Sequence, residues 1–207
     1  MEYDYKNIKV EVLPGNTVLI TEPVVIAIDP EPEDKSYIKK QRVSLVLISH
    51  DHKNHLNELA FFDDSVEKYL IGGNSPEQTS RITPGMVYIT QNIRVRILPA
   101  YNVNKQRKSN QLFHSRNDNG VGFLLLVNGK KVYYTGHTEK IPEMAKIEDL
   151  DILIAPVSNK MLLTPAEVNS IAYALDSDLV IPIYPKNTKI RMHMMKEMVA
   201  VCDRIGK

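Results

Sequence analysis

A six-residue stretch of this chain holds three histidines, His50, His52 and His55. They follow 44–48, a short apolar run with the character of a buried strand. Residues two apart on an extended segment share a face, so His50 and His52 point the same way, and His55 joins them if a helix begins there. Neutral imidazoles that converge at a strand end favour binding of a zinc-like cation. The alternative is a polar loop that is rich in histidine by chance.

The other three histidines are scattered along the chain, at His114, His137 and His193. His114 falls in 101–119, a long polar stretch that we expect to be a functional loop. His193 belongs to a C-terminal helical pattern, where a surface or packing role is expected. Serine hydrolysis is set aside because Ser49 lacks the flanking glycines of a nucleophile elbow.

Strands must position these histidines, and the sequence predicts many. The predicted strands cover 9–13, 17–20, 24–28, 44–48, 69–71, 86–89, 93–98, 121–127, 131–134, 152–155 and 179–183. In 93–98, apolar residues alternate with Arg94 and Arg96, and we interpret this run as a half-buried edge strand. Asn128 and Gly129 supply the turn of a hairpin between two of these strands.

Helical patterns are fewer and lie mostly later in the chain. Thr164 is a predicted N-cap with Glu167 three residues on, and it begins a helix that ends near Ala174. A short helix is expected within 31–40, and a helical stripe starts at Lys189. Strands in the middle with helices outside predict an α/β layered domain.

The composition fits one domain spanning 1–207. A formal net charge of +1 provides no field for nucleic acid or an anionic membrane. The single cysteine, Cys202, excludes an internal disulfide. The N-terminus lacks a signal-peptide pattern, and no apolar run approaches the roughly 20 residues of a membrane helix. We expect a cytoplasmic protein with a small-molecule substrate, no membrane association and no nucleic-acid partner; its oligomeric state is not predicted.

An ordered series of motifs surrounds the histidine cluster along nearly the whole chain. It comprises Ile-Asp-Pro at 28–30, Ser-His-Asp-His-Lys-Asn-His at 49–55, Pro-Ala-Tyr-Asn at 99–102, Phe-His at 113–114, Tyr-Thr-Gly-His-Thr-Glu at 134–139, Thr-Pro-Ala-Glu at 164–167 and Val-Ile-Pro-Ile-Tyr at 180–184. The series resembles the metallo-β-lactamase superfamily, in particular its branch of metal-dependent hydrolases with a Pro-Ala-Tyr-Asn segment. The resemblance implies an α/β fold, a four-layer αββα sandwich with a metal site at one edge of the sheets. There, one or two metal ions activate a water that attacks a carbonyl or phosphoryl centre.

Several positions depart from the family's ligand pattern. Asn54 replaces the aspartate of H-x-H-x-D-H, His137 replaces the bridging aspartate of A-G-D-T, and Tyr184 replaces the histidine of I-P-M-H-Y. Losing two aspartates removes two formal negative charges that would offset the repulsion between two dications. Tyr184 is neutral near pH 7 and is then a poor ligand. Asn102 stands where other branches place a ligand histidine. We therefore expect a degenerate active site that binds one zinc ion at most, or none.

The candidate metal ligands are His50, His52 and His137, with His55 and His114 as alternates, and the candidate catalytic residues are Asn54 and Tyr184. Tyr184 would donate a proton or a hydrogen bond to a substrate oxygen, or would plug the site. His137 has a second interpretation, as a filler that hydrogen-bonds to another histidine across a metal-free site. Asp29 either orients a ligand or simply ends its strand in a turn.

Two functions follow from these residues. The first is a metal-dependent hydrolase of the superfamily with a reduced, at most mononuclear site that activates water. The alternative is a catalytically inactive family member that acts as a binding or interaction module, as the loss of several ligands together indicates. Nuclease activity is disfavoured by the balanced charge. Four cations of the 101–119 loop would hold an anionic substrate if the loop covers the site, and are otherwise solvated: Lys105, Arg107, Lys108 and Arg116.

Overall fold

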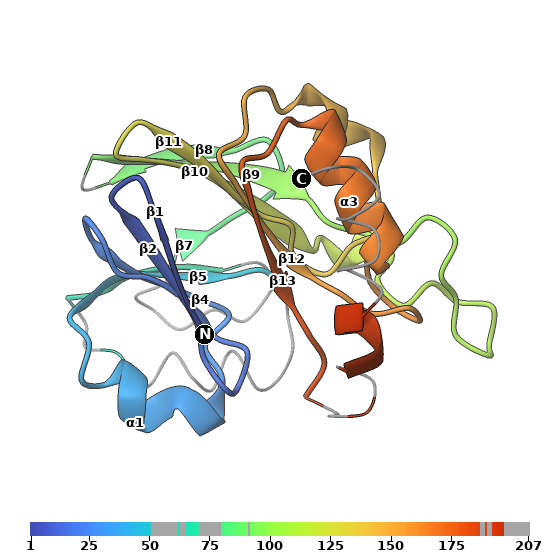
Figure 1. Ribbon diagram of the computed structural model, residues 1–207, viewed down its shortest axis with the longest axis horizontal. Helices are drawn as coiled ribbons and strands as arrows, with labels where there is room; N and C mark the ends of the chain where they lie inside the picture. The colour runs from blue at the N-terminus through green and yellow to red at the C-terminus, as the bar shows by residue number, and fades with distance from the viewer. Residues whose placement is uncertain are drawn as a thin grey trace.

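The computed structural model describes residues 1–50, 62, 65–70, 80–90, 92–186, 189 and 192–196. These residues form two β-sheets that face each other (Figure 1). The first has the strand order β1-β2-β3-β4-β5-β6-β7, and the second has β13-β12-β11-β10-β9-β8. The strands are β1 (Glu2–Tyr5), β2 (Ile8–Val12), β3 (Val18–Ile20), β4 (Val25–Ile28), β5 (Val43–Ile48), β6 (Glu67–Leu70), β7 (Ser80–Arg81), β8 (Val87–Thr90), β9 (Ile93–Pro99), β10 (Val121–Val127), β11 (Lys130–Tyr134), β12 (Ile152–Pro156) and β13 (Leu179–Ile183).

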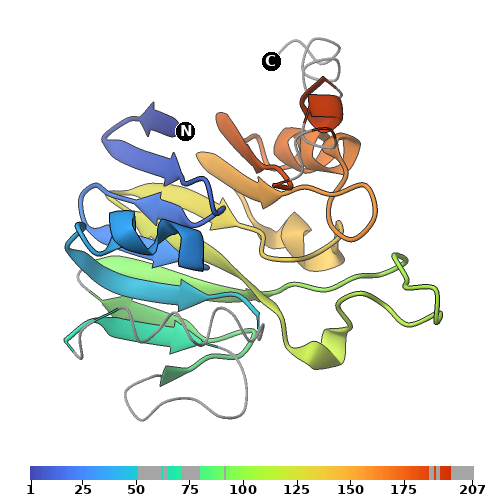
Figure 2. The same ribbon diagram turned by 90° about the horizontal axis from the view of Figure 1, so that it is seen from below.

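Helices cover the outer faces of both sheets, as Figures 1 and 2 show. They are α1 (Lys35–Ile38), α3 (Pro165–Ala174) and the 3-10 turns η1 (Pro32–Asp34) and η4 (Pro142–Lys146). A further 3-10 turn, η3 (Arg116–Asp118), lies in the loop between β9 and β10. Three apolar clusters separate the layers. Phe123 belongs to the cluster between the sheets, Val168 to the one beneath α3, and Ile38 to the one beneath α1. The predicted four-layer αββα sandwich is thereby confirmed. No helix in the described part of the chain is long and apolar enough to cross a membrane.

The local predictions agree with the structure at most elements. The helix after Thr164 is present, with the reciprocal capping contacts to Glu167. The prediction of an edge strand at 93–98 is wrong, because β9 lies between β8 and β10. Its alternation arises because the outer face of the sheet is exposed to solvent at Arg94 and Arg96 of β9, and a solvated face does not require an edge position. The short strands β1 and β7 were not predicted; both lie at the ends of the first sheet.

Parallel pairing places the ends of several strands at one edge of the sandwich. In the first sheet β4, β5 and β6 run parallel, and in the second β11, β12 and β13 do so. Ligands of α/β sheets bind where the carboxyl ends of such strands meet. The backbone N–H of Val121 donates to the carbonyl of Ser49 at 2.8 Å and joins the two sheets at this edge. This edge carries the histidines.

Candidate metal centre

Three histidines from distant parts of the chain meet at this edge. His50 follows β5, His137 follows β11, and His114 lies in the loop between β9 and β10. The ring centroids of His50 and His137 are 4.0 Å apart, those of His114 and His137 are 5.1 Å apart, and those of His50 and His114 are 6.4 Å apart. The sequence-based candidates His52, Asn54 and His55 lie outside the described residues. The structure thus brings His114, an alternate in the sequence prediction, next to His50 and His137.

A hydrogen-bonded chain fixes the orientation of His50. Asp29 accepts from the backbone N–H of Ser49 at 2.7 Å, from its hydroxyl at 2.5 Å and from the hydroxyl of Tyr134 at 2.7 Å. The Ser49 Oγ lies 2.7 Å from Nδ1 of His50. A serine hydroxyl has a single proton, and Ser49 donates it in the hydrogen bond to the Asp29 carboxylate. Its Oγ must therefore accept from Nδ1–H of His50. Neutral His50 therefore carries its lone pair on Nε2.

Asp29 occupies an uncommon backbone position. It is 4% exposed and has φ of 45°, in the left-handed region that non-glycine residues seldom adopt. Its backbone N–H still donates to the carbonyl of Leu47, which ties it to β5. Such conformations persist where the surrounding structure holds them, often at functional sites. Asp29 therefore ends its strand and also orients His50 through Ser49.

Tyr134 supplies Asp29 with a donor that stays protonated. Burial first, and then the neighbouring Asp29 carboxylate, raise the pKa of Tyr134 well above its ordinary value. The phenol is therefore neutral across the physiological range and keeps its hydrogen bond to Asp29.

A second residue fixes the orientation of His114. The side-chain amide of Asn102 donates to the carbonyl of Met161 at 2.8 Å, and its Oδ1 accepts from the backbone N–H of His114 at 2.8 Å. These backbone partners have fixed polarity, so they define which end of the amide is oxygen. The same Oδ1 lies 3.0 Å from Nδ1 of His114, which must donate to it. Neutral His114 therefore also keeps its lone pair on Nε2.

The chemistry of these donors fits a borderline dication such as Zn²⁺. Two imidazoles present Nε2 lone pairs, and hydrogen bonds on Nδ1 are the usual outer support of a ligand histidine. His137 stacks on His50 with an interplanar angle of 33°. Among the described residues, no three histidine, cysteine or acidic side chains are close enough to bind one metal ion together. The fit therefore rests on the donor set and its orientation.

Two cavities open beside the cluster and share His50 and His137. The larger has a volume of about 410 Å³, and Tyr184, only 8% exposed, lines it together with β12 and β13 residues. The smaller, of about 360 Å³, lies on the side of His114. The residues lining the larger cavity are Asn16, Asp29, Glu31, His50, Tyr134, His137, Pro156, Val157, Ser158, Lys160, Met161, Leu162, Ile183, Tyr184 and Pro185. A substrate in the larger cavity would contact mainly apolar walls beside the histidines.

The loop cations have different fates. Arg107 lines the smaller cavity and lies over the ring of Phe113. Arg116 pairs with Glu143 at 3.0 Å. Lys105 turns inward to acidic and carbonyl groups, so it is neither the substrate-binding nor the solvated cation considered from the sequence. Arg107 thus lies where a loop cation could contact an anionic substrate in the smaller cavity.

Comparisons with known proteins agree with the fold described above. The model of a family described as a beta-lactamase superfamily domain matches residues 9–184. A metal-dependent hydrolase from Methanocorpusculum labreanum is 26% identical over 166 residues, which cover 75% of this chain and 73% of that protein. The solved structure of a protein named as a metal-dependent hydrolase from Parabacteroides distasonis matches with a TM-score of 0.77 and 22% identity, covering 98% of this chain and 92% of that one. The metallo-beta-lactamase fold protein YhfI from Bacillus subtilis matches with a TM-score of 0.70 and 13% identity, covering 90% and 85%.

Proposed function

Since this chain belongs to the family described as a beta-lactamase superfamily domain, we propose that it is a metal-dependent hydrolase whose histidine cluster holds one divalent cation and no second, with zinc the matching ion. The relatives that are named metal-dependent hydrolases support the general activity. The reduced site is our own inference from Asn54, His137 and Tyr184 at positions where the family has other ligands.

The observation that carries the proposal is the chain from Asp29 through Ser49 to His50. It buries a carboxylate and a hydroxyl to hold one imidazole with Nδ1 protonated and Nε2 as the remaining donor. Burying a charged group is costly unless it is hydrogen-bonded. A buried hydrogen-bonded chain of this kind therefore indicates that the orientation of the imidazole matters. A metal ligand needs that orientation.

The described ligands favour a single ion. His50, His114 and His137 are neutral donors when they bind a metal, so they add no negative charge to offset two dications. When bound, a divalent cation supplies an activated water by lowering its pKa to about 7. His52 remains a proposed further ligand from the sequence.

The walls of the larger cavity would bind and orient the substrate. Tyr184 lines that cavity, as His137 does, and its hydroxyl is proposed to donate a hydrogen bond to a substrate oxygen. The apolar side chains of Val157, Leu162 and Ile183 line the same space and would limit the contact of a bound substrate with water.

Metal content and hydrolysis test the proposal together. Protein loaded with zinc and freed of excess ion should retain one zinc per chain and cleave p-nitrophenyl acetate or bis(p-nitrophenyl) phosphate. His50→Ala should lose both properties, whereas the matched variant His193→Ala, in the exposed C-terminal segment, should keep them. Wild-type protein that retains no zinc would overturn the proposal.

The alternative, a non-catalytic binding module, is favoured by one observation. His137 lies against His50, with ring centroids 4.0 Å apart and planes tilted by 33°, a contact that a residue filling a metal-free site would make. The filler role considered from the sequence was a hydrogen bond between histidines, which this ring contact does not test. If this is the function, zinc loading leaves the protein without bound metal, and His50→Ala changes no hydrolytic rate.

A further inference from the structure

Asn102 joins the candidate metal centre to a wall of the larger cavity. We propose that Asn102 is a positioning residue: its amide oxygen holds His114 in the Nδ1–H tautomer, and its amide nitrogen fixes the 158–163 loop relative to that histidine. The inference rests on the proposed function, because it assigns His114 as a ligand of that metal centre. Asn102 is 1% exposed, so its amide has its polar partners within the protein.

Three hydrogen bonds connect Asn102 to His114 across the base of the loop. The backbone N–H of Asn102 donates to the carbonyl of His114 at 2.7 Å, and Oδ1 of Asn102 accepts from the backbone N–H and from Nδ1 of His114. A carbonyl-type oxygen cannot donate, so this contact admits only the tautomer with hydrogen on Nδ1. The imidazole is thereby held in one orientation with Nε2 as its remaining donor.

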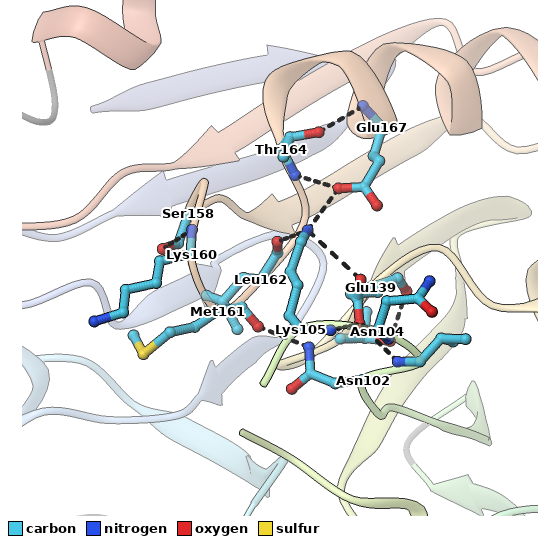
Figure 3. Close-up of polar contacts among 12 residues, drawn as sticks. Asn102, Asn104, Lys105, Glu139, Ser158, Lys160, Met161, Leu162, Thr164 and Glu167 are labelled. Carbon is cyan, nitrogen blue, oxygen red and sulfur yellow. Dashed lines mark hydrogen bonds and ion pairs between the residues drawn. The ribbon is translucent and has the colours of Figure 1, made fainter. Parts of the chain in front are cut away.

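The other end of the amide holds the 158–163 loop. Asn102 Nδ2 donates to the carbonyl of Met161 (Figure 3). Both Met161 and Leu162 line the larger cavity. The loop is closed on itself, since the N–H of Ser158 donates to the carbonyl of Leu163 at 2.8 Å. Asn102 therefore sets the distance between the ligand side of the site and this wall of the cavity.

Lys105 fixes the same loop from a neighbouring position, as Figure 3 shows. Its ammonium donates to the carbonyl of Leu162 and to the carboxylate of Glu167 at 2.7 Å, and it lies 3.9 Å from Glu139. Only 16% of the Lys105 side chain is exposed. Lys105 therefore contacts the loop but makes no hydrogen bond to His114 among those described, which separates its role from that of Asn102.

Glu139 anchors the backbone that carries both residues. One carboxylate oxygen accepts from the N–H groups of Val103, Asn104 and Lys105 at 2.6, 2.8 and 2.9 Å. Glu139 is 4% exposed, and its own N–H donates to the carbonyl of Tyr101. The Glu139 carboxylate thus holds the segment that follows Asn102.

Two substitutions separate the two roles. Asn102→Leu removes the acceptor from His114 and the donor to Met161, whereas Lys105→Met releases Leu162 and leaves the Asn102–His114 contact intact. Asn102→Asp is the conservative variant, because a carboxylate still accepts from Nδ1–H of His114. Asn169→Leu, at another buried asparagine, is the matched control for the loss of a buried amide.

The first measurement is the ¹⁵N chemical shift of the His114 ring in metal-free protein at pH 8. Wild type, Asn102→Asp, Lys105→Met and Asn169→Leu should show a protonated Nδ1, and Asn102→Leu should show a mixture or the Nε2–H form. The second is zinc affinity, measured by competition with a chromophoric chelator. Asn102→Leu should weaken it by about 10- to 100-fold, the usual effect of losing an outer partner of a ligand histidine, and Lys105→Met should change it less than about threefold.

The outcomes distinguish this inference from the proposed function. An unchanged His114 tautomer in Asn102→Leu would overturn the role of Asn102, whatever the protein binds. If the wild type binds no zinc but Asn102→Leu still changes the His114 tautomer, the proposed function is overturned and the positioning of His114 by Asn102 stands. If Asn102→Leu does not fold, Asn102→Ser serves in its place, since a shorter side chain also leaves Nδ1 of His114 without its acceptor.

Discussion

Replacing Ser49 with alanine should detach His50 from Asp29 with little other change. The Ser49 side chain is fully buried, and its hydroxyl is the link between the two residues, donating to Asp29 and accepting from Nδ1 of His50. The direct separation of Nδ1 from Asp29 Oδ2 is 3.9 Å, too long for a hydrogen bond. Alanine therefore removes the contact that defines which nitrogen of His50 is protonated.

The size of the effect follows from burial. A buried polar group that loses its partner costs about 1–3 kcal/mol, and His50 is 6% exposed, so the free energy of unfolding should fall by that amount. Asp29 keeps the backbone N–H of Ser49 and the hydroxyl of Tyr134, which limits the loss. Zinc affinity should fall by about 10- to 100-fold, as for other outer partners of ligand histidines.

Urea unfolding of the metal-free protein and chelator competition for zinc measure the two effects. Ser177→Ala is the matched control, because this buried serine donates to the carbonyl of Leu179 at 3.0 Å, away from the histidines. The control should lose stability and keep its zinc affinity. Equal zinc affinity in Ser49→Ala and wild type would refute the reasoning that this hydroxyl orients a ligand.

Three further predictions concern the surroundings of the site. Lys105→Met should lower the free energy of unfolding, measured in urea, by about 2–3 kcal/mol, because it removes the cation beside the carboxylates of Glu167 and Glu139. The three backbone N–H groups that donate to Glu139 limit the loss. Burial alone would raise the pKa of Glu167, but the hydrogen bonds from Lys105 and Thr164 outweigh it and hold this pKa below its ordinary value. The stabilisation from Glu167 is therefore present above its unfolded-state pKa and lost as the pH falls through the folded one, so Glu167→Gln should flatten the pH dependence of the urea midpoint on the acid side. Gly136→Ala should destabilise the protein and weaken zinc binding, because φ is 67° there and an added Cβ would lie 2.2 Å from the carbonyl oxygen of Val121; circular dichroism melts and chelator competition would detect either effect, and an unchanged melt would contradict the clash.

Much of the fold could be predicted because its elements are locally encoded. Buried strands such as 44–48 read as apolar runs, and the helix after Thr164 has its own capping residues. The neighbours of a strand are a non-local property, which is why β9 was expected at an edge. The first strand, with two acidic residues among four, has a surface-exposed pattern that differs little from a loop.

The candidate site divides in the same way. His50 could be predicted from its place after a buried strand. The partnership of His114 with Asn102 could not, because the two residues are twelve apart and meet only through the shape of the loop. Ser49 was assessed as a nucleophile and set aside, and its actual role depends on Asp29, twenty residues earlier. Lys105 was considered either a substrate-binding cation or a solvated loop cation, yet its ammonium donates to the carbonyl of Leu162 and to Glu167 of α3.

Anomalous diffraction from crystals of zinc-loaded protein, recorded on both sides of the zinc absorption edge, tests the central claim most directly. We expect one zinc peak per chain at about 2.0–2.1 Å from Nε2 of His50 and Nε2 of His114. A protein without a zinc peak at this edge of the sheets, or with a peak bonded to Nδ1 of either histidine, would contradict it.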